Sequence, residues 1–291
     1  MNGYNKGSVA LFVARVFSGL NVNALGYLLP LWIAPLSCVS VRLAFGAVVF
    51  WIVSIFIKPE NVGRKDVFKL VILGAFGIFG YMSLYALSIS YTTPVNFAIF
   101  NAMQPLWVVI VSAAVYRESV DARAMLCILS EPSKEVASNA MLGNMLAIAA
   151  SVIYAVYLVF SARMVGHLSS VTILRYTFSS AACMSLIFTF FVGFSAPLFT
   201  GGFHVKPFLV LLFVLLFPTV ATYFLIPIGL KYLKSTVVAL YGYVTLIVAA
   251  FVSFLTGMDR FEPVVLLSLL LIGVSIYLVS TVEGPREVKN G

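Results

Sequence analysis

Four amide side chains lie inside long apolar stretches of the sequence, where polar groups are uncommon. Asn21 and Asn23 belong to the first of these stretches, and Asn101 and Gln104 belong to the fourth. An amide in hydrocarbon surroundings is costly unless it faces a cavity or a hydrogen-bond partner. The amides therefore indicate either a polar cavity that binds a solute or hydrogen bonds that join helices. The sequence leaves both interpretations open.

Aromatic and hydroxyl side chains in other apolar stretches could complete the walls of such a cavity. The candidate wall tyrosines are Tyr85, Tyr154, Tyr157, Tyr223, Tyr241 and Tyr243. Tyrosine is also common at membrane interfaces, so packing or an interface position is the alternative for each of them. The predicted substrate-binding set is Asn21, Asn23, Tyr85, Asn101, Gln104, Tyr154, Tyr223, Tyr241 and Thr245.

Three arginines also lie within the apolar stretches. Arg42 and Arg175 lie within about two turns of the ends of their stretches, so snorkelling to the membrane surface is one interpretation. Their matching positions in two similar segments favour a structural role or a gate as the other. Arg15 lies deeper in its stretch and could attract an anionic group.

The elements that must position these residues are membrane-spanning helices. The chain has 291 residues, of which 62% are hydrophobic and 10% are charged, whereas a soluble domain is nearer half apolar and a quarter charged. About 20 apolar residues are needed for one helix to cross a bilayer. Nine stretches meet this length, at residues 9–32, 36–57, 67–91, 94–116, 141–164, 173–194, 208–230, 235–256 and 263–282. The sequence therefore predicts an all-α, polytopic membrane protein.

Two segments of the chain resemble each other. Residues 86–118 and 229–259 share a small residue followed by Leu, a polar helix start at Thr93 or Ser235, a long apolar helix and an acidic stop. Without gaps over the helix, Asn101 aligns with Gly242 and Gln104 aligns with Thr245. Internal repeats of this kind are typical of transporters, whose binding site lies where the repeats meet.

An inverted duplication requires five crossings in each half, and the first half has one too few. Residues 124–130 contain only about seven uncharged residues, which is too short to cross the bilayer. Ten crossings nevertheless place more of the flanking Lys and Arg residues on the cytoplasmic side than nine crossings do. We therefore predict two inverted five-helix repeats, at residues 7–136 and 141–283, with the fifth helix shortened or missing.

Charged and metal-binding side chains argue against several other activities. All ten acidic residues lie in loops or at helix ends, whereas a proton-driven antiporter normally has a protonatable group at mid-membrane. Facilitated diffusion or exchange is the simpler expectation. His167 and His204 lie in loops far apart, and the three cysteines are widely spaced. No spacing typical of a metal site is present, and we expect no catalytic residue, metal or cofactor.

The order of several motifs resembles a known family. The motifs are GLN at residues 19–21, Arg42, the run from Ala86 through Thr-Thr-Pro and Gln-Pro to Arg-Glu, and the segments that begin at Gly143 and Pro218. Together they resemble the EamA family of the drug/metabolite transporter superfamily. The resemblance implies ten helices in two inverted repeats, both termini in the cytoplasm, and a central cavity with alternating access for small organic solutes such as amino acids. The chain departs from the family's pattern in two ways. Its fifth helix is short, and Leu246 stands at a position where the family often has proline.

These observations predict a multi-pass transporter of the inner (plasma) membrane that is not an enzyme. Its expected partners are the lipid bilayer and a small-molecule substrate, and no nucleic acid is expected. The sequence leaves open whether the protein forms a homodimer. The alternatives are a remnant impaired by the short fifth helix and an integral-membrane enzyme. The substrate, the direction of transport and the energy source are not determined by the sequence.

Overall fold

The structure, a computed structural model, describes residues 3–29, 31–116, 138–200 and 204–259. Within these residues it is built from helices without strands, and eight helical spans are long and apolar enough to cross a membrane. The predicted spans from 9–32 through 235–256 each coincide with one of them. The short fifth segment near 124–130 and the span at 263–282 lie outside the described residues. The chain is a multi-pass, all-helical membrane protein, as its sequence predicts.

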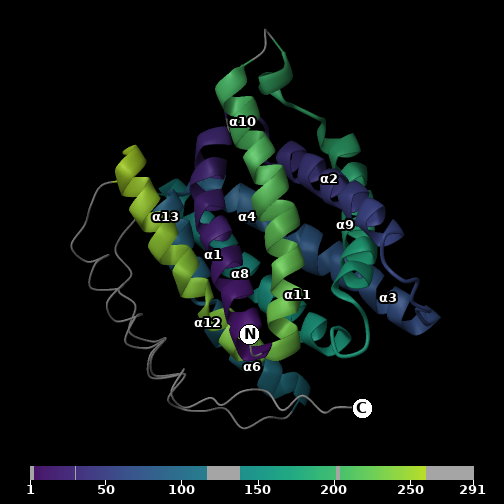
Figure 1. The fold of residues 1–291 in the computed structure, drawn as a ribbon. Helices are drawn as coiled ribbons and strands as arrows, with labels where there is room; N and C mark the ends of the chain where they lie inside the picture. Colours follow the sequence, from purple (N-terminus) through teal and green to yellow (C-terminus); the bar gives the residue numbers. More distant parts are fainter. Residues whose placement is uncertain (1–2, 30, 117–137, 201–203, 260–291) are drawn as a thin grey trace.

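The first half of the chain contains four described spans (Figure 1). The first two are α1 (Gly3–Leu28) and α2 (Pro35–Ile55). The third span is continuous through α3 (Arg64–Ile72), a π-helical segment η1 (Leu73–Ile78) and α4 (Phe79–Tyr91). The fourth is interrupted, with α5 (Pro94–Asn101) followed by α6 (Gln104–Tyr116).

The second half repeats this order of elements. The spans are α8 (Ser138–Met164), α9 (Ser170–Val192), the third span α10 (Val205–Val214), η3 (Leu215–Ala221) and α11 (Thr222–Tyr232), and the interrupted α12 (Ser235–Leu240) and α13 (Gly242–Thr256). A short 3-10 helix, η2 (Pro197–Phe199), lies between α9 and α10. Both third spans contain 28 residues and both carry a π-helical segment near their middle.

The two halves run through the membrane in opposite directions. Gly7, near the start of α1, packs against Tyr232, and Gly26, near the end of α1, packs against Pro94. Gly143, near the start of α8, packs against Thr92, which lies beside Pro94. The helix α8 therefore starts on the face where α1 ends. We call the face on which α1 begins the amino-terminal face and the other the distal face.

Exchanged packing partners agree with a twofold relation between the halves. The helix α1 packs against α11 and α13, and its counterpart α8 packs against α4 and α6. The counterparts α2 and α9 pack against each other along their lengths. The helix α6 packs against α12 and ends on the amino-terminal face, whereas α8 starts on the distal face. These contacts establish the inverted arrangement of the four described spans in each half. The repeat boundaries at 7–136 and 141–283 stay predictions, because residues 117–137 and 260–291 lie outside the described part.

The helix cap predicted at Thr93 is confirmed, whereas the cap predicted at Ser235 is wrong, although the helix does begin at Ser235. The Thr93 hydroxyl accepts a hydrogen bond from the Asn96 N–H at 3.3 Å, and Pro94 is the first helical residue. In the second repeat the cap position is Lys234, and Ser235 already lies within α12 without capping it. The gapless alignment places Ser235 opposite Pro94, so it takes the place of the proline and not of the cap.

Both fourth spans are interrupted near the same aligned position, with and without proline. Pro105 lacks an N–H, so it cannot continue the hydrogen bonding of α5, and the chain turns through Ala102 and Met103 before α6 begins. In the second repeat Leu246 stands in place of a proline, yet the helix is still interrupted at Tyr241, directly before Gly242. The interruption therefore belongs to the fold of both repeats.

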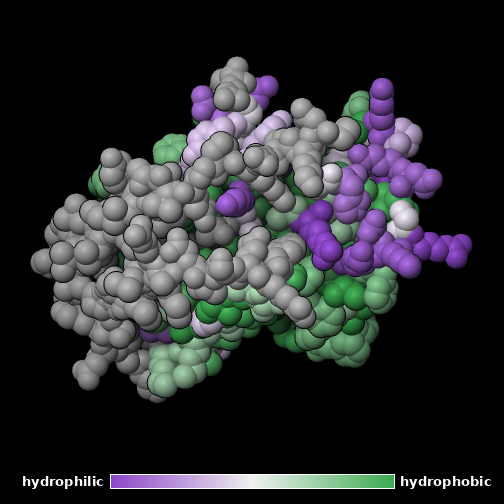
Figure 2. Space-filling model, turned by 90° about the horizontal axis from the view of Figure 1, so that it is seen from below, coloured by the Kyte–Doolittle hydropathy of each residue, from purple (hydrophilic) through white to green (hydrophobic). Residues whose placement is uncertain are grey.

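Charge differs between the two faces. On the amino-terminal face eight basic side chains are exposed, and Figure 2, which views that face, shows hydrophilic residues gathered over part of it. They are Lys6, Lys58, Arg64, Lys65, Lys69, Arg163, Lys231 and Lys234. On the distal face, Lys206 is the exposed basic residue among those described.

Candidate functional site

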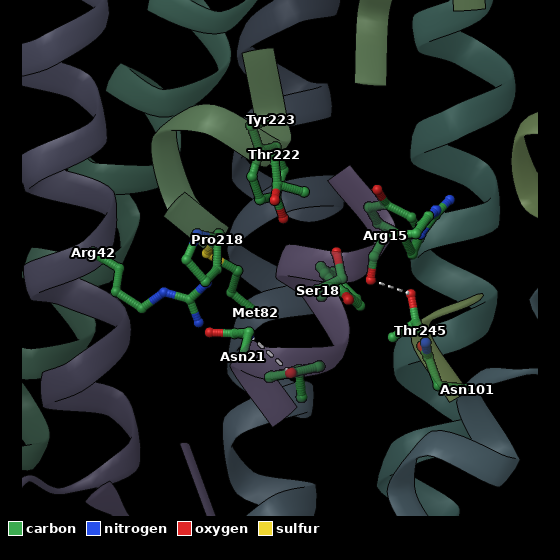
Figure 3. A pocket seen from close by; sticks show the side chains of 13 residues that line it. Arg15, Ser18, Asn21, Arg42, Met82, Asn101, Pro218, Thr222, Tyr223 and Thr245 are labelled. Atoms are coloured by element: carbon green, nitrogen blue, oxygen red, sulfur yellow. Dashed lines mark hydrogen bonds between the residues drawn. The ribbon is translucent and has the colours of Figure 1, made fainter. Parts of the chain in front are cut away.

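A small cavity lies near the centre of the bundle, where the two repeats meet (Figure 3). Its walls come from α1, α2, α4 and α5 of the first repeat and from α8, η3, α11 and α13 of the second. Its lining residues are Arg15, Ser18, Asn21, Arg42, Tyr81, Met82, Tyr85, Asn101, Tyr154, Pro218, Thr222, Tyr223 and Thr245. The cavity volume is about 30 Å³, which is room for about two water molecules at 10–15 Å³ each. In this conformation the cavity is small, and most of the polar side chains that line it are buried.

The π-helical segment η3 shapes one wall of the cavity. Pro218 lies within η3 and lines the cavity. Proline cannot donate the backbone hydrogen bond of a regular helix, so the chain widens locally. The Thr219 hydroxyl donates to the carbonyl of Val214 at 2.9 Å, five residues earlier. The widened turn brings Thr219, Thr222 and Tyr223 to the side of η3 and α11 that faces α1 and α2.

Arg42 does not snorkel to the membrane surface. Its side chain is 3% exposed and lines the cavity. Its Nε donates a hydrogen bond of 2.9 Å to the Thr219 hydroxyl. The snorkelling interpretation is therefore wrong for Arg42, and the reason is local. The neighbouring π-helical segment offers an acceptor and a polar cavity within reach, so the guanidinium group has partners inside the bundle.

Arg15 is the second arginine of the cavity. It is 3% exposed, and one terminal nitrogen donates to the carbonyl of Val238 at 3.1 Å. Its guanidinium carbon lies 5.9 Å from the centre of the Tyr154 ring, within the range of a cation–π interaction. Its Nε has no hydrogen-bond partner among the described residues. The Arg15 carbonyl also accepts a bond of 3.3 Å from the Thr245 hydroxyl, which joins α1 to α13.

Several other polar atoms of the cavity lack partners among the described residues. The Asn21 amide nitrogen donates to the Tyr85 hydroxyl at 2.8 Å, but the Asn21 carbonyl oxygen is buried and unpaired. The Asn101 carbonyl oxygen and the Tyr223 hydroxyl are also buried and unpaired. Buried polar groups are nearly always hydrogen-bonded in folded proteins. Their concentration here marks the cavity as a place where a polar molecule can supply the missing partners.

Stacked tyrosines form the wall on the α4 and α8 side. The Tyr81 ring centre lies 4.4 Å from that of Tyr154 and 5.7 Å from that of Tyr85. Tyr154 in turn stacks on Tyr157 at 5.7 Å. These rings fill the space between the cavity and the amino-terminal end of α4 and provide flat apolar surfaces beside the arginines.

The structure brings six of the nine predicted substrate-binding residues together around the cavity. These are Asn21, Tyr85, Asn101, Tyr154, Tyr223 and Thr245. The three others lie elsewhere. Asn23 donates to the Ala249 carbonyl at 3.0 Å and so joins α1 to α13, which fits the alternative of hydrogen bonds between helices. Gln104 is 1% exposed at the start of α6, with both amide atoms unpaired among the described residues and its oxygen near Gly242. Tyr241 lies at the interruption between α12 and α13.

Sequence reasoning missed several lining residues that helical spacing could have found. Ser18 precedes Asn21 by three residues, and Tyr81 precedes Tyr85 by four, so each shares a helix face with a predicted residue. Thr222 directly precedes Tyr223. For Arg42 the sequence suggests snorkelling, a structural role or a gate, but not a place in the lining of the cavity. Pro218 carried a signal as the proline of an apolar span, and Met82 carried none.

Comparison with known proteins agrees with this arrangement. The sequence model of the EamA-like transporter family matches residues 5–130 and 141–281, which is nearly the whole chain in two copies. The chain belongs to the EamA-like transporter family. It is a membrane transporter, and the resemblance stated from its motifs is confirmed.

Two further proteins are similar to this EamA-like transporter. The protein called uncharacterized transporter YyaM, from Bacillus subtilis (strain 168), is 23% identical over 264 residues, which cover 86% of this chain and 85% of YyaM. The second is a solved crystal structure of a protein that is 17% identical in sequence. The structural match has a TM-score of 0.71 and covers 97% of this chain and 98% of the chain in that structure. The latter shows that the fold is shared.

Proposed function

We propose that this EamA-like protein moves a small organic solute, such as an amino acid or another metabolite, across the membrane by alternating access. One observation carries the proposal: a small central cavity has walls from both inverted repeats and holds buried polar atoms that lack partners among the described residues. A site at the meeting of inverted repeats can be opened to either side when the repeats exchange conformations. The predicted substrate-binding residues Asn21, Tyr85, Asn101, Tyr154, Tyr223 and Thr245 act in this cavity.

An asymmetry between the repeats supports alternating access. The helix α10 and the following segment η3 both pack against α1, and the ring centres of Phe17 in α1 and Phe217 in η3 lie 5.0 Å apart. In the first repeat η1 also packs against α8, but α3 does not pack closely on it, and a groove of about 730 Å³ lies between α3 and α8. The groove reaches from Lys69 and His167 to Gly77 and Gly80, and Gly77 packs on Tyr157 beside the tyrosine wall. Exchange of the two arrangements would close this groove and open its counterpart on the distal face.

The charge distribution supports an orientation with both termini in the cytoplasm. Basic residues accumulate in the cytoplasmic loops of membrane proteins, and eight exposed basic side chains lie on the amino-terminal face. We infer that the amino-terminal face is cytoplasmic, and we propose the inner (plasma) membrane as the location. A cysteine placed at Lys206 would react with an impermeant reagent from outside the cell, and reaction from the cytoplasmic side alone would contradict this orientation.

The cavity's composition favours movement of the solute without proton coupling. The helices that line the cavity contain no Asp or Glu in their sequence. A proton-driven carrier uses a carboxylate or histidine at mid-membrane depth, and neither is among the lining residues. Facilitated diffusion or exchange of solutes is the mechanism that these residues support.

Transport by purified protein in vesicles tests the proposal. Counterflow uptake of labelled amino acids and other metabolites would be compared for the wild type, Asn101→Ala and Tyr223→Phe. Because the Asn101 oxygen and the Tyr223 hydroxyl have no partner among the described residues, their removal leaves folding intact but weakens solute binding. Tyr232→Phe, at the surface end of α11, is the matched control and keeps wild-type uptake.

The outcomes separate the proposal from its alternatives. Uptake that falls in both cavity variants, but not in Tyr232→Phe, supports a transporter that uses this cavity. Folded, monodisperse protein that moves none of the solutes would support the impaired remnant. Chemical conversion of a solute without uptake would support an integral-membrane enzyme.

A further inference from the structure

We propose that the solute bound in the central cavity is a small organic anion, with its carboxylate held by Arg42 and Arg15. The inference rests on the proposed function, because it names the class of substrate for the same cavity. It follows from the charges, the hydrogen bonds and the wall chemistry of that cavity.

The cavity contains two cationic side chains and no anionic one. Arg15 and Arg42 both line it, and both are 3% exposed. The helices that contribute the walls contain no Asp or Glu in their sequence. The carboxylates of the described residues, Glu60, Asp66 and Asp259, bond helix ends or surface side chains instead. Nothing described in the walls therefore neutralises the two guanidinium groups.

The arginines are not fully satisfied as structural residues. Arg42 makes one hydrogen bond to a described residue, from Nε to the Thr219 hydroxyl, and its fork of terminal nitrogens makes none. The Nε of Arg15 has no partner either. An arginine within a membrane-spanning helix is costly unless it has partners. Two such residues around one cavity, each with unused donors, are suited to a ligand that brings the missing negative charge.

The geometry of guanidinium groups favours a carboxylate. The planar fork of arginine donates two parallel hydrogen bonds to a carboxylate, which is stronger and more specific than a bond to a neutral group. In Figure 3, Arg42 reaches in from one side and Arg15 lies on the other, with Ser18 and Asn21 of α1 between them. The Tyr223 hydroxyl has no partner within residues 3–29, 31–116, 138–200 and 204–259, so it can donate to the same anion.

The cavity offers an ammonium group no carboxylate, but it does offer carbonyl oxygens. The Tyr154 face is already used by Arg15, and the lining has no carboxylate. The carbonyl oxygens of Asn21 and Asn101 are buried and have no partner among the described residues, so they can accept hydrogen bonds from an ammonium group. A carboxylic acid and the matching amino acid are therefore both included in the test.

A matched series of ligands tests the inference on wild-type protein. The melting temperature in detergent and the Kd by calorimetry would be measured with 3-phenylpropionate, 3-phenylpropionamide, phenethylamine and phenylalanine, and with propionate and propionamide. We expect the carboxylates to bind about 10- to 100-fold more tightly than their amides, the range for a hydrogen bond to a charged group. Equal binding of the amides, tighter binding of the amine, or no binding of any carboxylate would overturn the inference.

Arginine variants show which side chains cause the preference for carboxylate over amide. Arg175, which does not line the cavity, is the control. Arg42→Gln and Arg15→Gln remove the charge, and we expect each to abolish most of the preference for carboxylate over amide. Arg175→Gln, at the matching position of the second repeat, keeps that preference. Undiminished preference in both cavity variants would contradict the assignment. The wild-type ligand series remains decisive where a variant does not fold.

Vesicle uptake distinguishes failure of the inference from failure of the proposed function. If neutral or cationic solutes are carried and Tyr223→Phe slows them, the transporter stands and the anion inference fails. If carboxylates bind through Arg42 but no solute crosses the membrane, the anion site stands and the transporter mechanism fails.

Discussion

Arg42 and Arg175 occupy matching positions in the two repeats, but their surroundings differ. Arg42 is buried beside the central cavity and bonds Thr219. Arg175 is partly exposed and lies against aromatic rings, with its guanidinium carbon 5.3 Å from the Trp51 ring centre and 4.9 Å from that of Tyr176. Arg175 also has a carboxylate within electrostatic reach, because it contributes to lowering the pKa of Glu60. Arg42 has no such neighbour in the cavity.

The packing partner explains why the two arginines diverged. Arg42 faces the π-helical segment η3, where Thr219 offers an acceptor. The corresponding part of η1, residues 76–78, consists of Phe, Gly and Ile, none of which has a side chain that accepts a hydrogen bond. Arg175 therefore turns to the aromatic rings and to Glu60 near the amino-terminal face. Duplication preserved the residue, and the facing helix decided its role.

The largest expected loss of folded protein comes from a substitution that separates α2 and α9, the two helices that carry these arginines. A Cβ at Gly46 would lie 2.5 Å from Phe178, so Gly46→Leu forces α2 and α9 apart one turn from Arg42. Overpacking of this kind costs about 1–3 kcal/mol or more, and we expect little monodisperse protein by size-exclusion chromatography. Gly80→Leu is the control, because Gly80 faces the groove, where the nearest atom to its Cβ would lie at 3.6 Å. Normal yields of Gly46→Leu would show that the α2–α9 contact is looser than described.

An intermediate effect is expected from removing the acceptor of Arg42 alone. Thr219→Val keeps the shape of the side chain but leaves the Arg42 Nε unpaired, at a cost of about 1–3 kcal/mol for a buried donor. We expect a lower melting temperature and weaker uptake in vesicles. The matched change beside Arg175 is Ser179→Ala, which removes the acceptor of the Trp51 ring nitrogen at a partly exposed site. Equal losses in the two variants would remove the functional distinction between the arginines.

The smallest expected effect on stability comes from Glu60, the carboxylate near Arg175. Both Glu60 oxygens accept from the Ser169 N–H, at 3.0 and 3.1 Å, at the start of α9. Burial raises the pKa of Glu60, but the hydrogen bonds from Ser169 and Thr172 and the nearby Arg175 outweigh it, and its pKa lies below the ordinary value of 4.5. A lowered pKa stabilises the fold above pH 4.5, and this contribution is lost as the pH falls through the lowered pKa.

Glu60→Gln measures that contribution. At pH 7 we expect it to lower the free energy of unfolding by about 1 kcal/mol, the typical value for a lost helix cap. The difference from wild type would shrink as the pH falls below 4.5, when Glu60 itself becomes protonated. Thermal unfolding at pH 7 and at pH 4 compares the two proteins. A difference that grows on acidification would contradict the lowered pKa.

The membrane fold could be predicted almost completely from the sequence. Apolar length placed each described span within about six residues of its observed ends, and the repeated motifs predicted the inversion. Boundaries were less accurate where capping decides them. The prediction placed a cap at Ser235, but the chain turns one residue earlier, at Lys234.

The site was predictable in outline because amides and tyrosines are conspicuous in apolar helices. The place of Arg42 in the cavity could not be predicted from the sequence. Its burial depends on Thr219, which lies 177 residues later and becomes its hydrogen-bond partner only through a π-helical turn. Asn21 and Asn23 show the same limit of prediction from the sequence. They are two residues apart on one helix, and the facing helix alone determines that one bonds Ala249 and the other lines the cavity.

Accessibility of a single position in the cavity tests the central claim most directly. Ser18 lines the cavity between the two repeats, so Ser18→Cys in a background without the three native cysteines reports which side the cavity faces. In oriented vesicles, we predict that impermeant thiol reagents reach this cysteine from either face in turn and that a transported solute slows both reactions. Reaction from one face only, whatever the solute, would contradict a cavity that alternates between the two sides of the membrane.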